Sequence, residues 1–312
     1  MNWFIVSIIT MLCWGLADLF YKKGTDEEDI YSHLKIAVWV GLVMGICAFI
    51  LLPFSETGFS FGNLISSAVK YSPASVSYIL SMVIGYAGMR YLEVSIISPV
   101  QNASGALSTI TMAVYFALMG TMSSFWDEFS VLDVAGTVFI VIGVIALAIV
   151  EKNLSGKSDI SKSVPALIFP ITYCIFDTIG TAADGIILDE ETGLGLGEID
   201  VLILYGLTFM LCGLAAWIYM LIKTHKPYNP FVKSETSKCL AAVCEEGGQV
   251  FYVFAMAAKP MLAAPMIASY CIVSVILSRI FIKEKLKISQ YACVFAVIAG
   301  IVILGISEGI SY

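Results

Sequence analysis

Long runs of apolar residues, separated by short polar stretches, recur along the entire chain. A helix rises about 1.5 Å per residue, so about 20 apolar residues cross a hydrocarbon layer of roughly 30 Å. With loops placed where charges, Gly and Pro cluster, the pattern predicts about ten spanning helices. Their expected ranges are 3–21, 33–53, 73–91, 94–118, 131–150, 164–187, 200–222, 239–258, 261–281 and 288–307. We therefore expect an all-α polytopic membrane protein.

A hydrophilic stretch in the middle of the chain, EKNLSGKSDISKS at 151–163, predicts a boundary between two halves, 1–150 and 164–312. Five predicted spans lie on either side of this linker loop. Because five is odd, the second half is inverted relative to the first, as in many secondary transporters. The expected architecture is two inverted five-helix repeats.

The final spans of the two halves share an internal similarity. FWDEFSVLDVAGTVFIVIGVIAL at 125–147 aligns with IKEKLKISQYACVFAVIAGIVIL at 282–304. This alignment and weaker similarities elsewhere pair four positions: Asp127 with Glu284, Gly143 with Gly300, Pro99 with Pro265, and Asp18 with Asp177. Such shared patterns suggest that the halves are related copies.

The composition excludes a soluble domain, because 59% of the residues are apolar and only 13% are charged, against about a quarter in soluble proteins. The net charge of -7 gives no sign of nucleic-acid binding. The eight cysteines form no C-x-x-C pair, so they predict neither a disulfide scaffold nor a zinc site. His33 and His225 fall at helix ends or in loops, and no cofactor or metal is expected.

Basic residues are distributed unequally between the two sets of predicted helix ends. Of the 17 Lys and Arg, all but Lys70 and Lys259 lie at one set. By the positive-inside rule those ends face the cytoplasm. The rule places the 151–163 loop inside and both termini outside. We expect a multi-pass protein of the plasma membrane.

Two segments carry a resemblance to a known family. They are the opening WGLADLFYKKG at 14–24 and the closing IFIKEKLKISQYACVFAVIAGIVILGI at 280–306. They resemble the EamA-like branch of the drug/metabolite transporter superfamily, whose first helix often carries Trp-Gly and a Lys near its far end. In that branch an acidic residue just past the ninth span precedes a final helix with a small-residue face. With its five-plus-five order, the resemblance covers essentially the whole chain.

The resemblance implies an alternating-access carrier for amino acids, sugars, nucleotides or cationic drugs. It also implies a cavity lined by the first, third, fourth, sixth, eighth and ninth helices. Asp127 departs from the Glu usual in the first copy.

Ionisable groups inside predicted spans cost about 2.5–3.5 kcal/mol each on insertion scales, so they suggest a functional site. Asp18 has two interpretations, a cavity residue or a partner of Lys22 one turn later. Asp177 lies deeper, and Thr181 and Asp184 continue its helix face. The alternative for Asp177 is a hydrogen bond to a neighbouring helix.

The run CEEGGQVFYVFAM at 244–256 places two acids, two glycines and a glutamine within an apolar span. The glycine pair allows a kink or close approach, and an interrupted helix could expose backbone carbonyls to a ligand. Adjacent side chains point about 100° apart, so only one of Glu245 and Glu246 can face a cavity, and we favour Glu245. Alternatively the span begins later and both acids lie at the lipid headgroups.

Further candidates follow the prolines of the fourth and ninth spans, and aromatic residues could offer π-faces to an ammonium group. Both kinds of residue also serve helix packing in membranes. The candidate substrate-binding or coupling residues are Trp14, Asp18, Tyr78, Gln101, Asn102, Asp177, Glu245, Glu246, Gln249, Tyr252 and Tyr270.

Buried acids without buried bases favour a positively charged cargo, or coupling to protons or sodium. We therefore expect a secondary transporter of a small polar metabolite, amine-bearing such as an amino acid. A multidrug or cation exporter and a sugar or nucleoside permease are the alternatives. A membrane-embedded enzyme should show paired His/Asp or Ser/His/Asp sets at helix ends, and the sequence shows none. The inverted repeat argues against a channel. The expected partners are the small-molecule substrate and the lipid bilayer, with the chain a monomer or weak homo-oligomer.

Overall fold

The computed structural model describes residues 2–55, 58, 61–92, 94–121, 126, 129–154, 166–189, 193–283 and 287–310. All regular secondary structure within these residues is helical. Seven of the described helical segments are long and apolar enough to cross a membrane. Together with a mean hydropathy of +0.91, they confirm an all-α protein of the membrane. The predicted Asp127–Glu284 pairing and most of the predicted linker loop lie outside the described residues.

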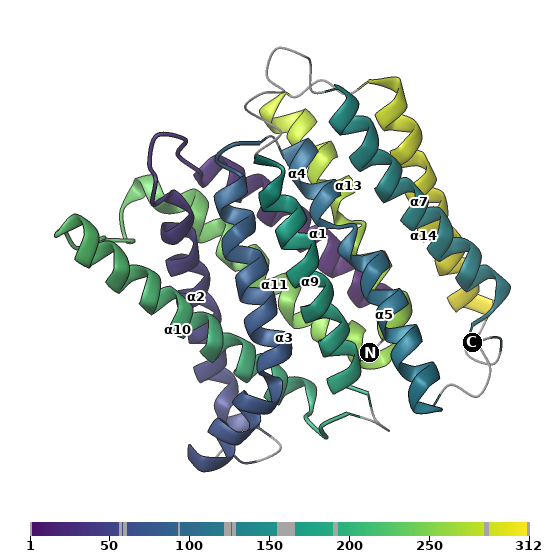
Figure 1. Ribbon diagram of the computed structural model, residues 1–312, viewed down its shortest axis with the longest axis horizontal. Coiled ribbons are helices and arrows are strands. Elements are labelled where there is room, and N and C mark those ends of the chain that lie inside the picture. Colours follow the sequence, from purple (N-terminus) through teal and green to yellow (C-terminus); the bar gives the residue numbers. More distant parts are fainter. Residues whose placement is uncertain are drawn as a thin grey trace.

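The helices stand side by side as one bundle (Figure 1). The first half contributes α1 (Trp3–Gly24), α2 (Ser32–Leu51), the 3-10 turn η1 (Leu52–Phe54), α3 (Phe61–Gly88), α4 (Val94–Gln101), α5 (Ser104–Met119) and α7 (Val131–Leu154). The second half contributes α9 (Ile168–Ile187), α10 (Glu198–Thr224), the 3-10 turn η2 (Lys233–Glu235), α11 (Thr236–Ala258), α12 (Pro260–Ala268), α13 (Tyr270–Leu277), the π-helical turn η3 (Ser278–Ile282) and α14 (Ile288–Ile310).

Two predicted spans are divided in the structure. The predicted span 94–118 breaks at Asn102 and Ala103 between α4 and α5, and 261–281 breaks at Ser269 between α12 and α13. Each break lies within one turn after a proline, Pro99 or Pro265. Proline lacks the N–H of a regular helix and clashes with the preceding turn, which weakens the helix locally.

Two other expectations were wrong. α3 begins at Phe61 rather than near residue 73 and continues through Pro73. Asn63 and Lys70, two polar residues before the predicted start of the span, are exposed on this helix. α11 runs unbroken through Gly247 and Gly248, so the predicted interruption is absent there.

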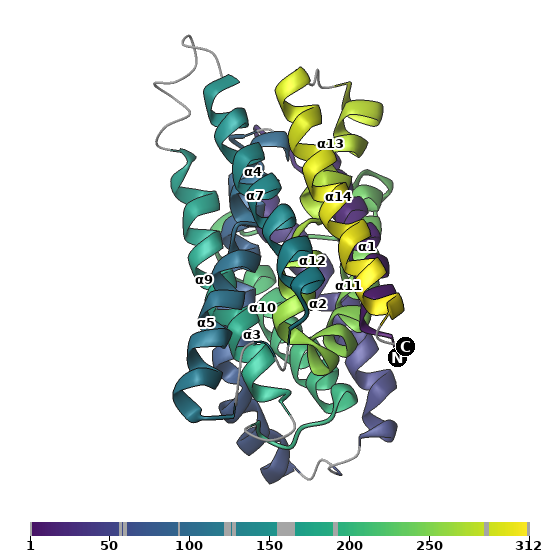
Figure 2. The ribbon, with the colours of Figure 1, turned by 90° about the vertical axis from the view of Figure 1, so that its right-hand side faces the viewer.

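Neighbouring helices come mainly from different halves of the chain. α1 packs against α11, and α3 packs against α9; these four helices, with the divided pairs α4/α5 and α12/α13, surround the centre. The pairs α2/α10 and α7/α14 form the two flanks (Figures 1 and 2). Small residues allow close backbone approach at the flanks: a Cβ on Gly41 would lie 2.5 Å from the Phe209 carbonyl oxygen.

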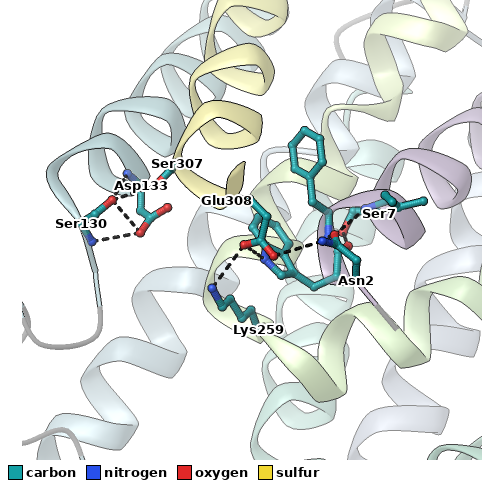
Figure 3. Close-up of polar contacts among 10 residues, drawn as sticks. Asn2, Ser7, Ser130, Asp133, Lys259, Ser307 and Glu308 are labelled. Carbon is teal, nitrogen blue, oxygen red and sulfur yellow. Dashed lines mark hydrogen bonds and ion pairs between the residues drawn. The ribbon is translucent and has the colours of Figure 1, made fainter. Parts of the chain in front are cut away.

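The two chain ends meet in a polar group that we call the terminal cluster, Asn2, Trp3, Lys259 and Glu308 (Figure 3). The Glu308 carboxylate accepts hydrogen bonds from Trp3 Nε1 at 2.5 Å and from Asn2 Nδ2 at 3.3 Å, and it pairs with Lys259 Nζ at 3.4 Å. Asn2 also caps α1 through its side-chain oxygen. The cluster joins the start of α1, the α11–α12 junction and the end of α14.

Candidate functional site

Two adjoining cavities lie at the centre of the bundle, each with about 20 Å³ of space for water-sized molecules. Both are walled by the aromatic residues Trp14, Tyr78, Tyr173 and Tyr270. We name each cavity after one acid that lines it. The Glu245 cavity is also lined by Asp18, Tyr21, Tyr86, Gln101 and Glu245. The Asp177 cavity is also lined by Asn102, Ser104, Asp177, Thr181 and Tyr252.

Glu245 lies on α11 and is only 3% exposed. Its carboxylate accepts hydrogen bonds from the hydroxyls of Tyr78 on α3, at 2.8 Å, and Tyr21 on α1, at 3.4 Å. The Tyr86 hydroxyl donates in turn to Tyr21 at 3.1 Å. Glu245 therefore lies in the interior of the bundle, more than two helical turns after the start of α11 at Thr236.

Asp18 is buried where α1 meets α4 and α13. Ser98 and Ser274 donate to its Oδ2, both at 2.7 Å. The predicted alternative pairing with Lys22 does not occur: Lys22 Nζ donates instead to the carbonyl oxygen of Met89 at 2.8 Å and forms an ion pair with Glu27. Lys22 thus ties the end of α1 to the α3–α4 junction.

Two acids lie on one face of α9, seven residues apart. Asp177 accepts a hydrogen bond from Ser104 on α5 at 2.5 Å. Asp184 is completely buried and accepts from the hydroxyls of Tyr71, Tyr205 and Tyr252. A hydrogen bond to a neighbouring helix, the alternative considered for Asp177, does occur, but Asp177 also lines a cavity.

Each of the four acids Asp18, Asp177, Asp184 and Glu245 accepts its side-chain hydrogen bonds from hydroxyl groups. The ion pairs found among the described residues involve other carboxylates, all near helix ends. A hydroxyl can donate to an ionised carboxylate or accept from a protonated one. The four carboxylates of the site are therefore either negatively charged or protonated, and no described Lys or Arg side chain forms an ion pair with them.

Trp14 is the centre of an aromatic group between the cavities. Its ring lies 5.2 Å from Tyr252, 5.7 Å from Tyr270 and 6.3 Å from Tyr78, measured between ring centroids. Gly248 makes room for this indole, because a Cβ there would lie 2.2 Å from Trp14 Cδ1. Aromatic rings of this kind can attract cations through their π-faces.

The amides predicted for the site differ in their surroundings. Gln101 lines the Glu245 cavity, and its Nε2 is buried without a hydrogen-bond partner among the described residues. Asn102 donates to the Ser98 carbonyl oxygen at 2.8 Å and lines the Asp177 cavity. Gln249 is buried with both polar atoms unpartnered within the described chain, yet it is not among the residues that line either cavity.

Glu246 is separated from the other predicted residues. It is half-buried, lies beside Cys47 of α2, and is not among the lining residues of the two cavities. This placement follows the expectation that adjacent side chains of one helix face different directions.

Three tyrosines of the site were not singled out from the sequence: Tyr21, Tyr71 and Tyr205. Ser98, Ser104 and Ser274 were noted near the prolines of the fourth and ninth spans but were not kept as candidates. Each is a hydroxyl residue within an apolar segment, which is the signal that could have found them. In membrane helices this signal is weak, because hydroxyl residues are also common packing residues. In the part of the chain that the structure describes, no group of three or more His, Cys, Asp and Glu side chains could hold a metal ion.

No family model matches the sequence, and no curated protein matches it. Solved structures do match: one, described as "Crystal structure of protein", has a TM-score of 0.63 at 11% identity. The match covers 98% of this chain and 97% of that chain. At this identity the likeness shows the fold alone, over nearly the whole length of both chains.

Proposed function

We propose that the chain is a secondary, alternating-access transporter for a small polar metabolite that bears an amine, such as an amino acid. The observation that carries this proposal is the placement of Glu245 and Asp177 on adjoining central cavities that share aromatic walls. Carboxylates and π-faces both attract an ammonium group, and among the described residues no Lys or Arg lines these cavities to repel it.

The cavity size fits an occluded step of such a cycle. About 20 Å³ accommodates little more than a water molecule, so loading a metabolite requires the surrounding helices to move apart. The divided helices α4/α5 and α12/α13 supply backbone breaks next to the cavities, where discontinuous helices of transporters commonly change shape.

We also propose that the bundle consists of ten spans in two inverted five-helix repeats, as in the EamA-like branch of the drug/metabolite transporters. In such a repeat, α1, α3 and α5 correspond to α9, α11 and α13. If each helix is replaced by its counterpart, the α1–α11 contact becomes α9–α3, and the α1–α13 contact becomes α9–α5. All four of these contacts occur. The flank pairs α2/α10 and α7/α14 each join helices at equivalent positions of the halves, and both helix breaks follow a proline.

A thermal-shift screen of the purified protein tests the function, because a ligand that binds the native state raises its apparent stability. The probes are leucine, putrescine, choline and glucose, followed by uptake of any stabilising probe into proteoliposomes. An amine that stabilises the protein and enters the liposomes, while glucose does neither, supports the proposal. Stabilisation by glucose alone would contradict the proposal and indicate a sugar permease instead.

A cation exporter is the second candidate, favoured by the aromatic group around Trp14. A quaternary ammonium offers no N–H donors and relies on π-faces and charge, whereas a primary amine also uses hydrogen bonds to carboxylates. Binding of choline without binding of leucine or putrescine would select this candidate.

A further inference from the structure

Asp184 occupies a closed site on the border of the cavities. Its carboxylate is fully buried, and its three partners, Tyr71, Tyr205 and Tyr252, are at most 3% exposed. Tyr71 on α3 donates to Oδ1, while Tyr205 on α10 and Tyr252 on α11 donate to Oδ2, the last at 2.9 Å. Side chains from three helices therefore converge on one carboxylate of a fourth helix, α9.

The titratable groups that face Asp184 are these three phenols and, two turns earlier on α9, Asp177. No Lys, Arg or His of the described chain pairs with it, and Lys259 at the nearby α11–α12 junction pairs with Glu308. A carboxylate without a cation in a dry site is stable only when donors or a proton offset its charge. Here every donor is a hydroxyl, which can turn from donating to accepting when the carboxylate takes up a proton.

Only one of the three phenols connects this site to a cavity. Tyr252 lines the Asp177 cavity and contacts Trp14, whereas Tyr71 and Tyr205 line neither cavity. Asp184 itself is not among the lining residues, because the phenols enclose it. Tyr252 therefore stands between the Asp177 cavity, which it lines, and the Asp184 carboxylate, to which its hydroxyl donates.

We propose that Asp184 is the proton-binding site that couples transport to a proton gradient, separate from the carboxylates that hold the cargo. In the proton step, the Tyr252 oxygen accepts a proton from a hydronium ion in the Asp177 cavity, which is left as water, and the phenol's own hydroxyl proton passes to Asp184 Oδ2. The O–H bond of the phenol breaks as the new one forms, so Tyr252 ends neutral and Asp184 ends as a carboxylic acid. The coupling role, though not the protonation itself, rests on the proposed transport function.

Infrared difference spectroscopy of the purified protein after a pH jump tests the site without any cargo. We expect acidification to produce a carboxylic-acid C=O band, one component of which is missing in Asp184→Asn and retained in Asp177→Asn. In Tyr205→Phe the same component should shift in frequency, because that phenol donates to Asp184. The shift in Tyr205→Phe assigns the band to Asp184 even if the Asp184→Asn variant does not fold. A component that neither variant changes would overturn the proposal.

The relay is tested by a matched pair, Tyr252→Phe and Tyr71→Phe. Each removes one phenol donor from Asp184, but only Tyr252 lies on the cavity. Tyr252→Phe should slow the appearance of the Asp184 component roughly ten-fold or more, and Tyr71→Phe should not. Equal rates in the two variants would show that Tyr252 has only the structural role that it shares with Tyr71.

Coupling is measured separately, as uptake of leucine, putrescine or choline into proteoliposomes with and without a pH gradient. Asp184→Asn should lose the acceleration by the gradient and keep the uptake that runs down the cargo gradient. Gradient-driven uptake that survives in Asp184→Asn would refute the coupling role. If none of the probes is transported but Asp184 still titrates in the infrared, the transport proposal fails and the proton site stands.

Discussion

The indole Nε1 of Trp14 donates a hydrogen bond to the backbone carbonyl oxygen of Glu245, 3.2 Å away, and so joins α1 to α11 beside the cavities. Gly248 permits this contact, since a Cβ at that position would lie 2.3 Å from Nε1. Of the two possibilities raised for the glycine pair, a kink or close approach, Gly248 thus provides close approach to the indole.

Gly248→Ala should therefore displace Trp14 and destabilise the protein by about 1–3 kcal/mol, as overpacking generally does. Gly247→Ala is a matched control on the same helix, because the atom nearest to a Cβ there would be the Cys13 sulfur, at an ordinary contact distance of 3.7 Å. Thermal unfolding in detergent compares the two. Equal melting temperatures would mean that α1 and α11 are not in tight contact at Trp14.

Glu245→Gln should abolish stabilisation by amine probes and their uptake, because the amide keeps the shape of the side chain and removes its charge. Glu246→Gln is the control, since the neighbouring acid is not among the residues that line the cavities. Circular dichroism should show both variants folded. Normal amine uptake by Glu245→Gln would remove this carboxylate from the cargo site.

Glu308→Gln should destabilise the terminal cluster by about 1–3 kcal/mol. The substitution removes the charge of a buried carboxylate that accepts hydrogen bonds from the Trp3 indole and the Asn2 amide. Lys259→Met should cost less than about 1 kcal/mol, since this lysine is 47% exposed and its ion pair is long, at 3.4 Å. Thermal unfolding measures both. The reverse order of effects would assign the stabilisation to the ion pair and not to the buried hydrogen bonds.

Asp29, in the loop between α1 and α2, gives a pH-dependent contribution to stability. Partial burial raises its pKa, but the hydrogen bond from Lys35, 2.7 Å away, the hydrogen bond from the Tyr31 backbone and the charges of Lys35 and Lys238 together outweigh burial and leave the pKa below its ordinary value. A lowered folded-state pKa means that the carboxylate stabilises the protein above the unfolded-state pKa of about 3.9, and that this contribution is lost as the pH falls through the folded value.

Asp29→Asn should thus lower the melting temperature at pH 7, by the equivalent of about 1 kcal/mol or less. The difference from wild type should shrink as the pH falls below about 3.9. In a Lys35→Met background the same substitution should have a smaller effect at neutral pH. A difference that does not change with pH would mean that the charge of Asp29 does not contribute.

The unequal distribution of basic residues predicts that the 151–163 loop is cytoplasmic. A cysteine introduced as Ser158→Cys, with the eight native cysteines replaced, should react with a membrane-impermeant maleimide only after the cells are opened. A cysteine at Lys70, one of the two basic residues at the opposite ends, is the control and should react in intact cells. Labelling of position 158 from outside would invert the orientation.

The sequence by itself determined the class of the protein and the segments that enter the membrane. Long apolar runs require helices in lipid, because every backbone polar group must be satisfied within the segment. This requirement is local, so α1, α2, α10 and α14 begin and end within a few residues of their predicted ranges. The rarity of acids in apolar runs also indicated Asp18, Asp177 and Glu245, which the structure places on the cavities.

Only the tertiary structure decided what each acid contacts. Ser98 and Ser274 are 80 and 256 positions from Asp18 in sequence, and no local pattern relates them to it. A helix face turned to lipid and one turned to the protein interior can be equally apolar, so hydropathy does not reveal which face looks inward. For this reason the sequence presented Glu245 and Glu246 as alternatives and gave no role to Asp184 or its three tyrosines. The packing of four helices brings those side chains together, and that packing depends on contacts between distant segments.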